Sequence, residues 1–285
     1  MSQMYGYVDG KYMRSRTSNR IRTIELNKPL LGAAALMVAC LLFSFWLMIS
    51  EMNREWMLHI HSTPFMPAWF WSILNLGGDA WVVLLFLLLA ERRPGEVTSW
   101  VLKTWILGAL VAQLLKQIFP VARPASVLSP DNLVLIDHPP LISGSMPSGH
   151  ALAAISCCLI VCALLHSRGV RHWQLAVIAL IALLVAWARV SVGAHWPADV
   201  FAGAGLAIAV VAATHYWEKH SSWNEWFTKQ SGVVFLIFLH ILIALHLTSA
   251  QSQLFAVQFV QFSLSCLSLL KALSLIKENF FRRLI

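Results

Sequence analysis

Long apolar runs, separated by short polar connections, dominate the pattern of the chain. About 20 apolar residues are needed to cross the ~30 Å hydrocarbon core of a bilayer. Runs close to this length occur at 30–50, 69–90, 98–119, 148–166, 173–192, 198–217, 232–249 and 254–270. The pattern therefore predicts an all-α, polytopic integral membrane protein with eight spanning helices.

The composition agrees with this prediction. Hydrophobic residues make up 58% of the 285 residues and charged residues only 12%, whereas soluble domains carry about 25% charged residues. In a soluble chain the net charge of +8 would suggest nucleic-acid binding, but here most of the basic residues lie at the ends of the apolar runs or in the connections between them. We therefore expect the chain to contact the membrane bilayer and no nucleic acid.

The basic residues also indicate an orientation. If the N-terminus is cytoplasmic, 17 of the 21 Lys and Arg residues fall on the inner side of the membrane. Because cytoplasmic segments are enriched in Lys and Arg, both termini are predicted to be cytoplasmic. The outer side keeps only Arg54, Lys116, Arg123 and Arg189, and these exceptions need a separate explanation.

The same pattern divides the chain into three parts. Residues 1–28 are polar and basic and predict a cytoplasmic tail. Residues 29–217 hold six spans, which we expect to form the functional core. Residues 218–285 hold two additional spans and a short cytoplasmic tail, and the role of these spans stays open.

Three polar clusters fall on the predicted outer side. They read KQIFPVARP from Lys116 to Pro124, PSGH from Pro147 to His150, and ARVSVGAHWPAD from Ala188 to Asp199. Four different spans therefore deliver polar and charged residues to one membrane surface. We interpret this convergence as a binding or catalytic site.

The first two clusters are typical of an anion site. Pro120 is expected to end the third span, and Arg123 is biased to an extended conformation because Pro124 follows it. Ser148 and Gly149 open the fourth span, where free N–H groups and the helix dipole favour an anion. Gly149 would let a phosphate approach the backbone, and the Ser148 hydroxyl would add a donor.

The third cluster adds a nucleophile. His195 and Asp199 flank Pro197, and the four-residue spacing predicts that both lie in the first turn of the sixth span, on one face. A carboxylate at one ring nitrogen makes the other nitrogen a better nucleophile. Arg189, at the end of the fifth span, can bind phosphate oxygens bidentately. Half of a metal site is the alternative, but few other ligands lie on this side, so we expect no metal and no cofactor.

These motifs resemble those of the type 2 phosphatidic acid phosphatase (PAP2) superfamily, K-x6-R-P, P-S-G-H and S-R-x5-H-x3-D. The chain departs from the pattern at Ala188, where the family has Ser. The resemblance covers roughly 30–217 and implies a six-helix core, to which the last two spans are an addition. It looks like the bacterial lipid-phosphate branch, in the inner membrane with the active site facing the periplasm.

The resemblance also implies roles for the motif residues. His195 would attack phosphorus and form a phosphohistidine, Asp199 would orient His195, and His150 would be the general acid. The phosphoryl oxygens would be held by five residues, namely Lys116, Arg123, Ser148, Gly149 and Arg189. The reaction would need no metal.

The expected substrate is a lipid phosphate or pyrophosphate. Undecaprenyl pyrophosphate is the leading candidate, followed by phosphatidylglycerophosphate and phosphatidic acid. One alternative is a lipid A phosphatase, or a phosphotransferase that passes a phosphoryl group from polyprenyl pyrophosphate to lipid A. A minor alternative is a non-catalytic lipid-binding or transport protein, although transport sites are usually near the membrane midplane. The oligomeric state stays open.

Some features have two interpretations. Asp79 follows Gly77 and Gly78 inside the second span, and it is either functional or paired with a helix end. The aromatic residues at 69–71 either border an entry for a lipid tail or form an ordinary interfacial belt. The outer loop 125–146 is expected to be a lid or an entrance wall.

Overall fold

The computed structural model describes residues 30–137, 144–249 and 252–281, and across these ranges every regular element is a helix. The predicted tail at 1–28 lies outside the described residues. In chain order the elements are α1 (Leu30–Ile49), α2 (Met52–Ser62), α3 (Ala68–Leu76), α4 (Ala80–Ala90), α5 (Thr98–Ile118), α6 (Pro124–Val127), η1 (Pro130–Asn132), α7 (Gly149–Ser167), α8 (His172–Ser191), α9 (Pro197–Lys219), α10 (Trp223–Phe227), α11 (Gln230–Ser249) and α12 (Phe255–Phe281).

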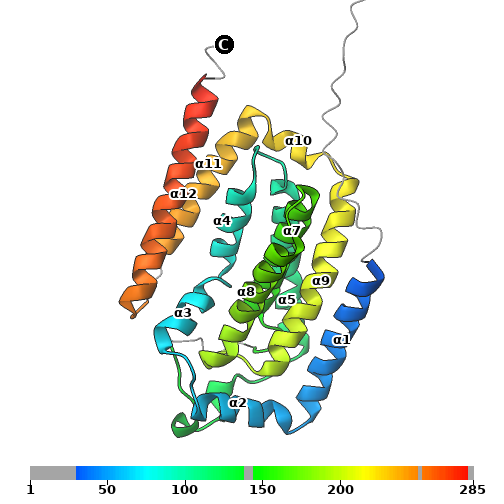
Figure 1. Cartoon of the computed structure of the whole chain (residues 1–285), viewed down its shortest axis with the longest axis vertical. Coiled ribbons are helices and arrows are strands. Elements are labelled where there is room, and N and C mark those ends of the chain that lie inside the picture. Colours follow the sequence, from blue (N-terminus) through cyan, green and yellow to red (C-terminus); the bar gives the residue numbers. More distant parts are fainter. Residues whose placement is uncertain (1–29, 138–143, 250–251, 282–285) are drawn as a thin grey trace, which may run out of the picture.

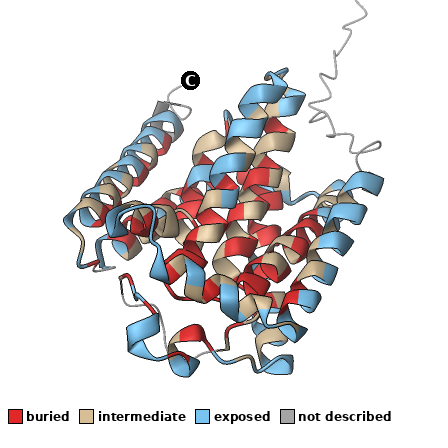
Figure 2. Cartoon of the chain, turned by 60° about the horizontal axis from the view of Figure 1, so that its bottom comes forward, coloured by how far each residue is buried: buried red, intermediate tan, exposed pale blue. Residues whose placement is uncertain are grey.

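The long helices form a bundle around α7, which contacts α4, α5, α8 and α9 (Figure 1). Helix α1 packs along α9 at one edge, and the α11–α12 hairpin packs on α3 and α4 at the other. Buried residues gather in the interior of the bundle, while exposed residues cover much of its periphery (Figure 2). Many of the exposed side chains on α1 and α12 are apolar, such as Phe45 and Phe259, and large exposed apolar surfaces of this kind mark contact with a membrane.

The all-α membrane fold is confirmed. Within the described ranges, seven helices are long and apolar enough to cross a membrane, and the bent pair α3–α4 makes an eighth crossing if it is one span. The prediction of one continuous second span was wrong, because α3 and α4 meet at an angle of 63°. At the break, Asp79 is extended and its Oδ1 accepts hydrogen bonds from the backbone N–H groups of Trp81 and Val82. Asp79 is thus paired with a helix end and starts α4 as its N-cap.

Helix α2 was not predicted, and it lies across the end of the bundle where α9 begins (Figure 1). Asn53 Oδ1 accepts a hydrogen bond from the N–H of Ala198 at 3.0 Å, in the first turn of α9. His61 Nε2 lies 3.0 Å from the carbonyl oxygen of Val190, and its Nδ1 accepts from the N–H of Val134 at 3.1 Å. Helix α2 therefore contacts both helices that flank the turn between α8 and α9, and it stabilises that turn.

The C-terminal hairpin is joined to the outer loop through Asp137. Its carboxylate accepts hydrogen bonds from Ser72 of α3 at 2.7 Å and from Ser252, in the α11–α12 connection, at 2.9 Å. Asp137 has a φ of 60°, a conformation that Asp and Asn tolerate better than most residues. One carboxylate thus connects the broken second span, the outer loop and the added hairpin.

Candidate active site

The three motifs meet at one end of the bundle, where α5 ends and α7 and α9 begin. Helix α5 ends at Ile118, as Pro120 predicts, and Arg123 is extended with φ −74° and ψ 154°. The N–H of Ser145 donates to the carbonyl of Val121, and Trp196 Nε1 donates to that of Ala122. These bonds hold the segment before Arg123 against the other two motifs.

A tight turn after α8 presents His195. Gly193 has a φ of 80°, in the left-handed region that favours glycine. The N–H groups of Ala194 and His195 then both donate to the carbonyl of Arg189. His195 therefore lies in the turn two residues before α9, and the prediction that it lies in the first turn of the helix was wrong. Asp199 does lie in that first turn.

The two ring nitrogens of His195 face different groups. Nδ1 lies 3.3 Å from Oδ2 of Asp199, and Nε2 lies 3.4 Å from Nη1 of Arg123. A guanidinium only donates, so we assign the proton of the neutral ring to Nδ1 and the free lone pair to Nε2. The side chain is 2% exposed. The predicted orientation of His195 by Asp199 thus has the geometry that it requires.

Asp199 is itself held by two further donors. Its Oδ2 accepts from the N–H of Trp196 at 2.9 Å and from the Ser145 hydroxyl at 2.5 Å. Ser145 was missed by the sequence analysis. The only available signal was a hydroxyl residue two positions before Pro147 of the PSGH motif, and the sequence does not show which group such a loop residue contacts.

The start of α7 has the features of an anion cradle. Ser148 is the N-cap of α7, and its hydroxyl accepts from the N–H of Ala151 at 3.3 Å. A Cβ added to Gly149 would meet no other group within 4 Å, so the space beside its backbone is open. His150 follows in the first turn and packs against the α3–α4 break, where a Cβ on Gly78 would lie 3.0 Å from His150 Cβ.

Positive charge converges on the same place. Arg123 is buried and donates to the carbonyl of Ala194 at 2.8 Å. Arg189 is 4% exposed, and its Nη1 donates to Asn75 Oδ1 at 2.5 Å. Lys116 lies close enough for its charge to interact with those of Arg123, Arg189 and Asp199. Burial, and then the charges of these three cations, hold the pKa of His195 well below its usual range.

Ala188, the departure from the family pattern, is fully buried and packs in an apolar cluster with Trp71 and Val192. A methyl group suits this environment better than a hydroxyl. In the described part of the chain, no group of three or more His, Cys, Asp or Glu side chains is placed to hold a metal ion.

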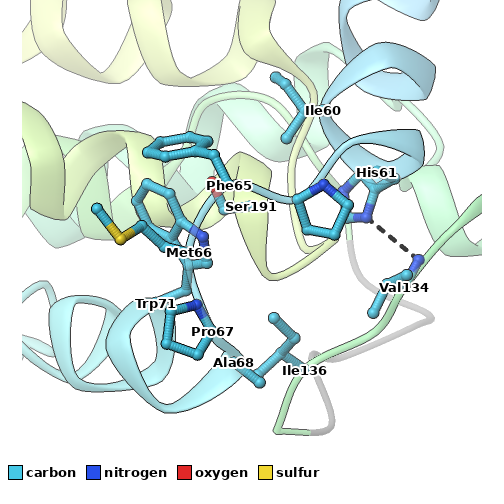
Figure 3. Close-up of a pocket in the computed structure, with 11 residues that line it drawn as sticks. Ile60, His61, Phe65, Met66, Pro67, Ala68, Trp71, Val134, Ile136 and Ser191 are labelled. Carbon is cyan, nitrogen blue, oxygen red and sulfur yellow. Dashed lines mark hydrogen bonds between the residues drawn. The ribbon is translucent and has the colours of Figure 1, made fainter.

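A separate apolar pocket of about 440 Å³ lies between α2, α3 and the end of α8 (Figure 3). Trp71 lines it and is buried, whereas Trp69 is exposed. Of the three aromatic residues considered as an entry, one therefore borders a cavity. The hydroxyl of Ser191 also lines the pocket and has no hydrogen-bond partner among the described residues.

Comparisons with known proteins agree with the resemblance that the motifs show. The model of the PAP2 superfamily matches residues 97–223. Over 123 residues the chain is 30% identical to a Sulfolobus acidocaldarius protein named undecaprenyl-diphosphatase, covering 43% of this chain and 56% of that relative. The alignment thus spans little more than half of the relative.

Two solved structures are also similar. Aquifex aeolicus LpxE is 26% identical with a TM-score of 0.49, covering 58% of this chain and 96% of that one. A transmembrane PAP2-type phosphatidylglycerolphosphate phosphatase from Bacillus subtilis is 18% identical with a TM-score of 0.40, covering 71% of this chain and 92% of that one. The family model spans all three motifs and confirms the resemblance that they predicted: residues 97–223 form a PAP2 superfamily segment.

Proposed function

We propose that the chain is a membrane lipid phosphatase that hydrolyses a phosphomonoester or pyrophosphate on a lipid headgroup through a phosphohistidine at His195. The proposal rests on one observation above all. The Nε2 lone pair of His195 faces the guanidinium of Arg123, while Asp199 holds the Nδ1 side of the ring. A buried imidazole with this orientation, beside three cations, is suited to attack a phosphorus atom.

In the first step, Nε2 of His195 attacks phosphorus and forms a P–N bond. The bond from phosphorus to the leaving oxygen breaks, and that oxygen keeps the electron pair and takes a proton from His150. The Asp199 carboxylate stabilises the positive charge that develops on the ring. Lys116, Arg123, Arg189 and the backbone N–H groups at the start of α7 stabilise the added negative charge on the phosphoryl oxygens.

In the second step, water attacks the phosphohistidine. His150, now neutral, accepts a proton from the water, and the P–N bond breaks to restore Nε2 of His195. Inorganic phosphate leaves, and His150 is protonated again for the next cycle. The chain's own side chains supply every proton and charge that these two steps require.

For the substrate we propose a lipid whose phosphate lies at the membrane surface while its tail stays in the bilayer. The motif residues lie at helix ends, and the helices around them expose apolar side chains. Undecaprenyl pyrophosphate is the leading candidate, supported by the name of the 30% identical relative. Phosphatidylglycerophosphate and phosphatidic acid present the same terminal phosphate and are the broader alternatives.

The proposed location is a bacterial inner membrane with the site facing the periplasm and both termini in the cytoplasm. The distribution of basic residues in the sequence supports it, since the order of the spans predicts that 17 of 21 fall on the opposite side from the site. At that opposite end, Lys103 of α5 forms an ion pair of 2.6 Å with Glu218 of α9.

The test is release of inorganic phosphate by the detergent-purified protein in EDTA. The substrates are undecaprenyl pyrophosphate, phosphatidylglycerophosphate, phosphatidic acid and lipid A, each with the wild type and His195→Ala. We expect EDTA-resistant release from at least one lipid, competitive inhibition by vanadate, and loss of release in the variant. A variant that keeps its thermal midpoint but loses turnover shows that the loss is chemical. Turnover that survives in His195→Ala would remove the phosphohistidine.

Phosphoryl transfer to lipid A, the alternative reaction, is tested in a separate experiment. If no lipid alone releases phosphate, labelled polyprenyl pyrophosphate is supplied together with lipid A. Transfer of label to lipid A would then replace hydrolysis as the function of the same site.

A further inference from the structure

We propose that Asn75 is a positioning residue that orients Arg189 in the phosphate site, and that it must be a neutral amide to do so. The inference rests on the proposed function and deepens it. Asn75 lies outside the PAP2 superfamily segment, in the last turn of α3, and is not part of any of the three motifs.

Asn75 contacts the guanidinium of Arg189 directly and occupies one of its edges. Nη1 of Arg189 donates to Asn75 Oδ1 at 2.5 Å. Nε of Arg189 is buried and has no hydrogen-bond partner among the residues that the structure describes. Since a buried donor without a partner is costly, an oxygen-bearing ligand at Nε would relieve that cost. Asn75 thus holds one side of Arg189 and leaves another for phosphate.

The break in the second span brings Asn75 to this position. A Cβ on Gly77 would lie 3.1 Å from Cγ2 of Val185, so the end of α3 approaches α8 closely. Val185 and Arg189 are four residues apart in α8 and lie on the same face of that helix. Close approach at Gly77 therefore places Asn75 within reach of Arg189.

The neutrality of the amide matters because Arg189 is a phosphate ligand in the proposed mechanism. A carboxylate at position 75 would form an ion pair with Arg189 and compete with the phosphoryl oxygens. An amide oxygen accepts the same hydrogen bond without adding a negative charge next to the guanidinium. The carboxylate of Asp79 attracts the charge of Arg189, but its hydrogen bonds go to the N–H groups that open α4, and its Oδ1 lies 3.7 Å from Nε2 of His246.

The test compares Asn75→Ala with Asn75→Asp. Vanadate affinity is measured by the rise in thermal midpoint, which needs no turnover, and kcat and KM are measured on undecaprenyl pyrophosphate. We expect vanadate affinity to fall about tenfold in Asn75→Ala and about a hundredfold in Asn75→Asp. If Asn75 only supported the fold, Asp, which keeps the shape and the acceptor, would be milder than Ala. That reverse order would overturn the proposal.

A matched control separates the effect of a negative charge next to Arg189 from the effect of a negative charge elsewhere on the protein. Asn132→Asp makes the same substitution at an exposed position of η1, and we expect it to leave vanadate affinity unchanged. An equal loss in Asn132→Asp and Asn75→Asp would contradict a specific effect on Arg189.

A double-mutant cycle tests whether Asn75 acts through Arg189. In an Arg189→Ala background, Asn75→Ala should cause no further loss of vanadate affinity, because the group that it positions is gone. Additive losses would overturn the proposal. Failure of the proposed function is distinguishable, because it appears in the wild type as absence of His195-dependent phosphate release. An active wild type with unaltered Asn75 variants would overturn the role of Asn75 alone.

Discussion

The hydroxyl of Ser145 donates a hydrogen bond of 2.5 Å to Oδ2 of Asp199, and both side chains are buried. The loop before α7 thereby holds the carboxylate that faces His195. The same loop is fixed by a second bond, from the Ser145 N–H to the carbonyl of Val121. The orientation of the proposed nucleophile thus depends on a residue outside all three motifs.

We expect Ser145→Ala to lower kcat ten- to a hundredfold with little change in KM. A hydrogen bond to a charged group contributes about 1.5–3 kcal/mol, and about 1.4 kcal/mol corresponds to a tenfold change in rate. Steady-state kinetics on the active lipid would measure both constants. Ser129→Ala removes a hydroxyl from an exposed loop position and serves as the control. An unchanged kcat in Ser145→Ala would mean that Asp199 needs no help from Ser145.

The second prediction concerns pH. Because burial and nearby cations lower the pKa of His195, the ring stays neutral, and Nε2 stays nucleophilic, in mildly acidic solution. The acid limb of kcat/KM should therefore lie below the usual histidine pKa of about 6.5. Arg123→Gln removes one of the cations and should move this limb to higher pH, even if activity is much reduced. A wild-type limb at or above pH 6.5 would be inconsistent with the structure.

The lowered pKa of His195 also predicts a stability effect. A histidine whose pKa is lower in the folded than in the unfolded state stabilises the fold above about pH 6.5, and this contribution is lost as the pH falls through the folded pKa. The thermal midpoint of the wild type should therefore drop more on acidification than that of His195→Gln. Parallel pH profiles of the two midpoints would contradict a shifted pKa.

The third prediction tests the contact between Gly78 and His150. An added Cβ would lie 3.0 Å from His150 Cβ and 3.3 Å from its carbonyl oxygen, so we expect Gly78→Ala to displace the proposed general acid. Overpacking of this kind costs about 1–3 kcal/mol, and we expect kcat to fall about tenfold or more. The control is Gly32→Ala in α1, where an added Cβ meets nothing within 4 Å. Full activity in Gly78→Ala would show that His150 tolerates the displacement.

The fourth prediction concerns the C-terminal hairpin. Asp137→Asn keeps a residue that tolerates the φ of 60° but replaces one acceptor oxygen by an NH₂ group, which weakens the bonds from Ser72 and Ser252. Loss of such bonds destabilises by about 1–3 kcal/mol, so the thermal midpoint in detergent should fall. Asp131→Asn, at an exposed position, should leave the midpoint unchanged. Equal midpoints in the Asp137 and Asp131 variants would mean that the hairpin is held by apolar packing alone.

The pattern of the sequence was sufficient for the fold class and for the residues of the motifs. Span length follows from bilayer thickness, so the apolar runs could be read directly. The end of α5 followed from Pro120 and the start of α9 from Pro197. The sidedness of the three clusters followed from counting spans. That His195, Asp199, Arg123 and Arg189 gather in one place was therefore predictable without coordinates.

The break in the second span was not predictable from the apolar run, because hydropathy does not distinguish a straight helix from a bent one. Gly77, Gly78 and Asp79 were visible in the sequence, and Asp79 was considered both as a functional residue and as a helix-end partner. Only the structure shows that it caps α4 and that the end of α3 lies close to α8.

By itself, the sequence determined that this protein crosses a membrane several times and that one end of its bundle has the composition of a phosphate site, because both depend on local residue types and spacing. Only the tertiary structure decided which groups hold the site residues in place. Ser145 reaches Asp199 across 54 positions and Asn75 reaches Arg189 across 114. Such partners are set by how helices pack, and single polar residues in loops and helix ends have no periodic pattern that would reveal them.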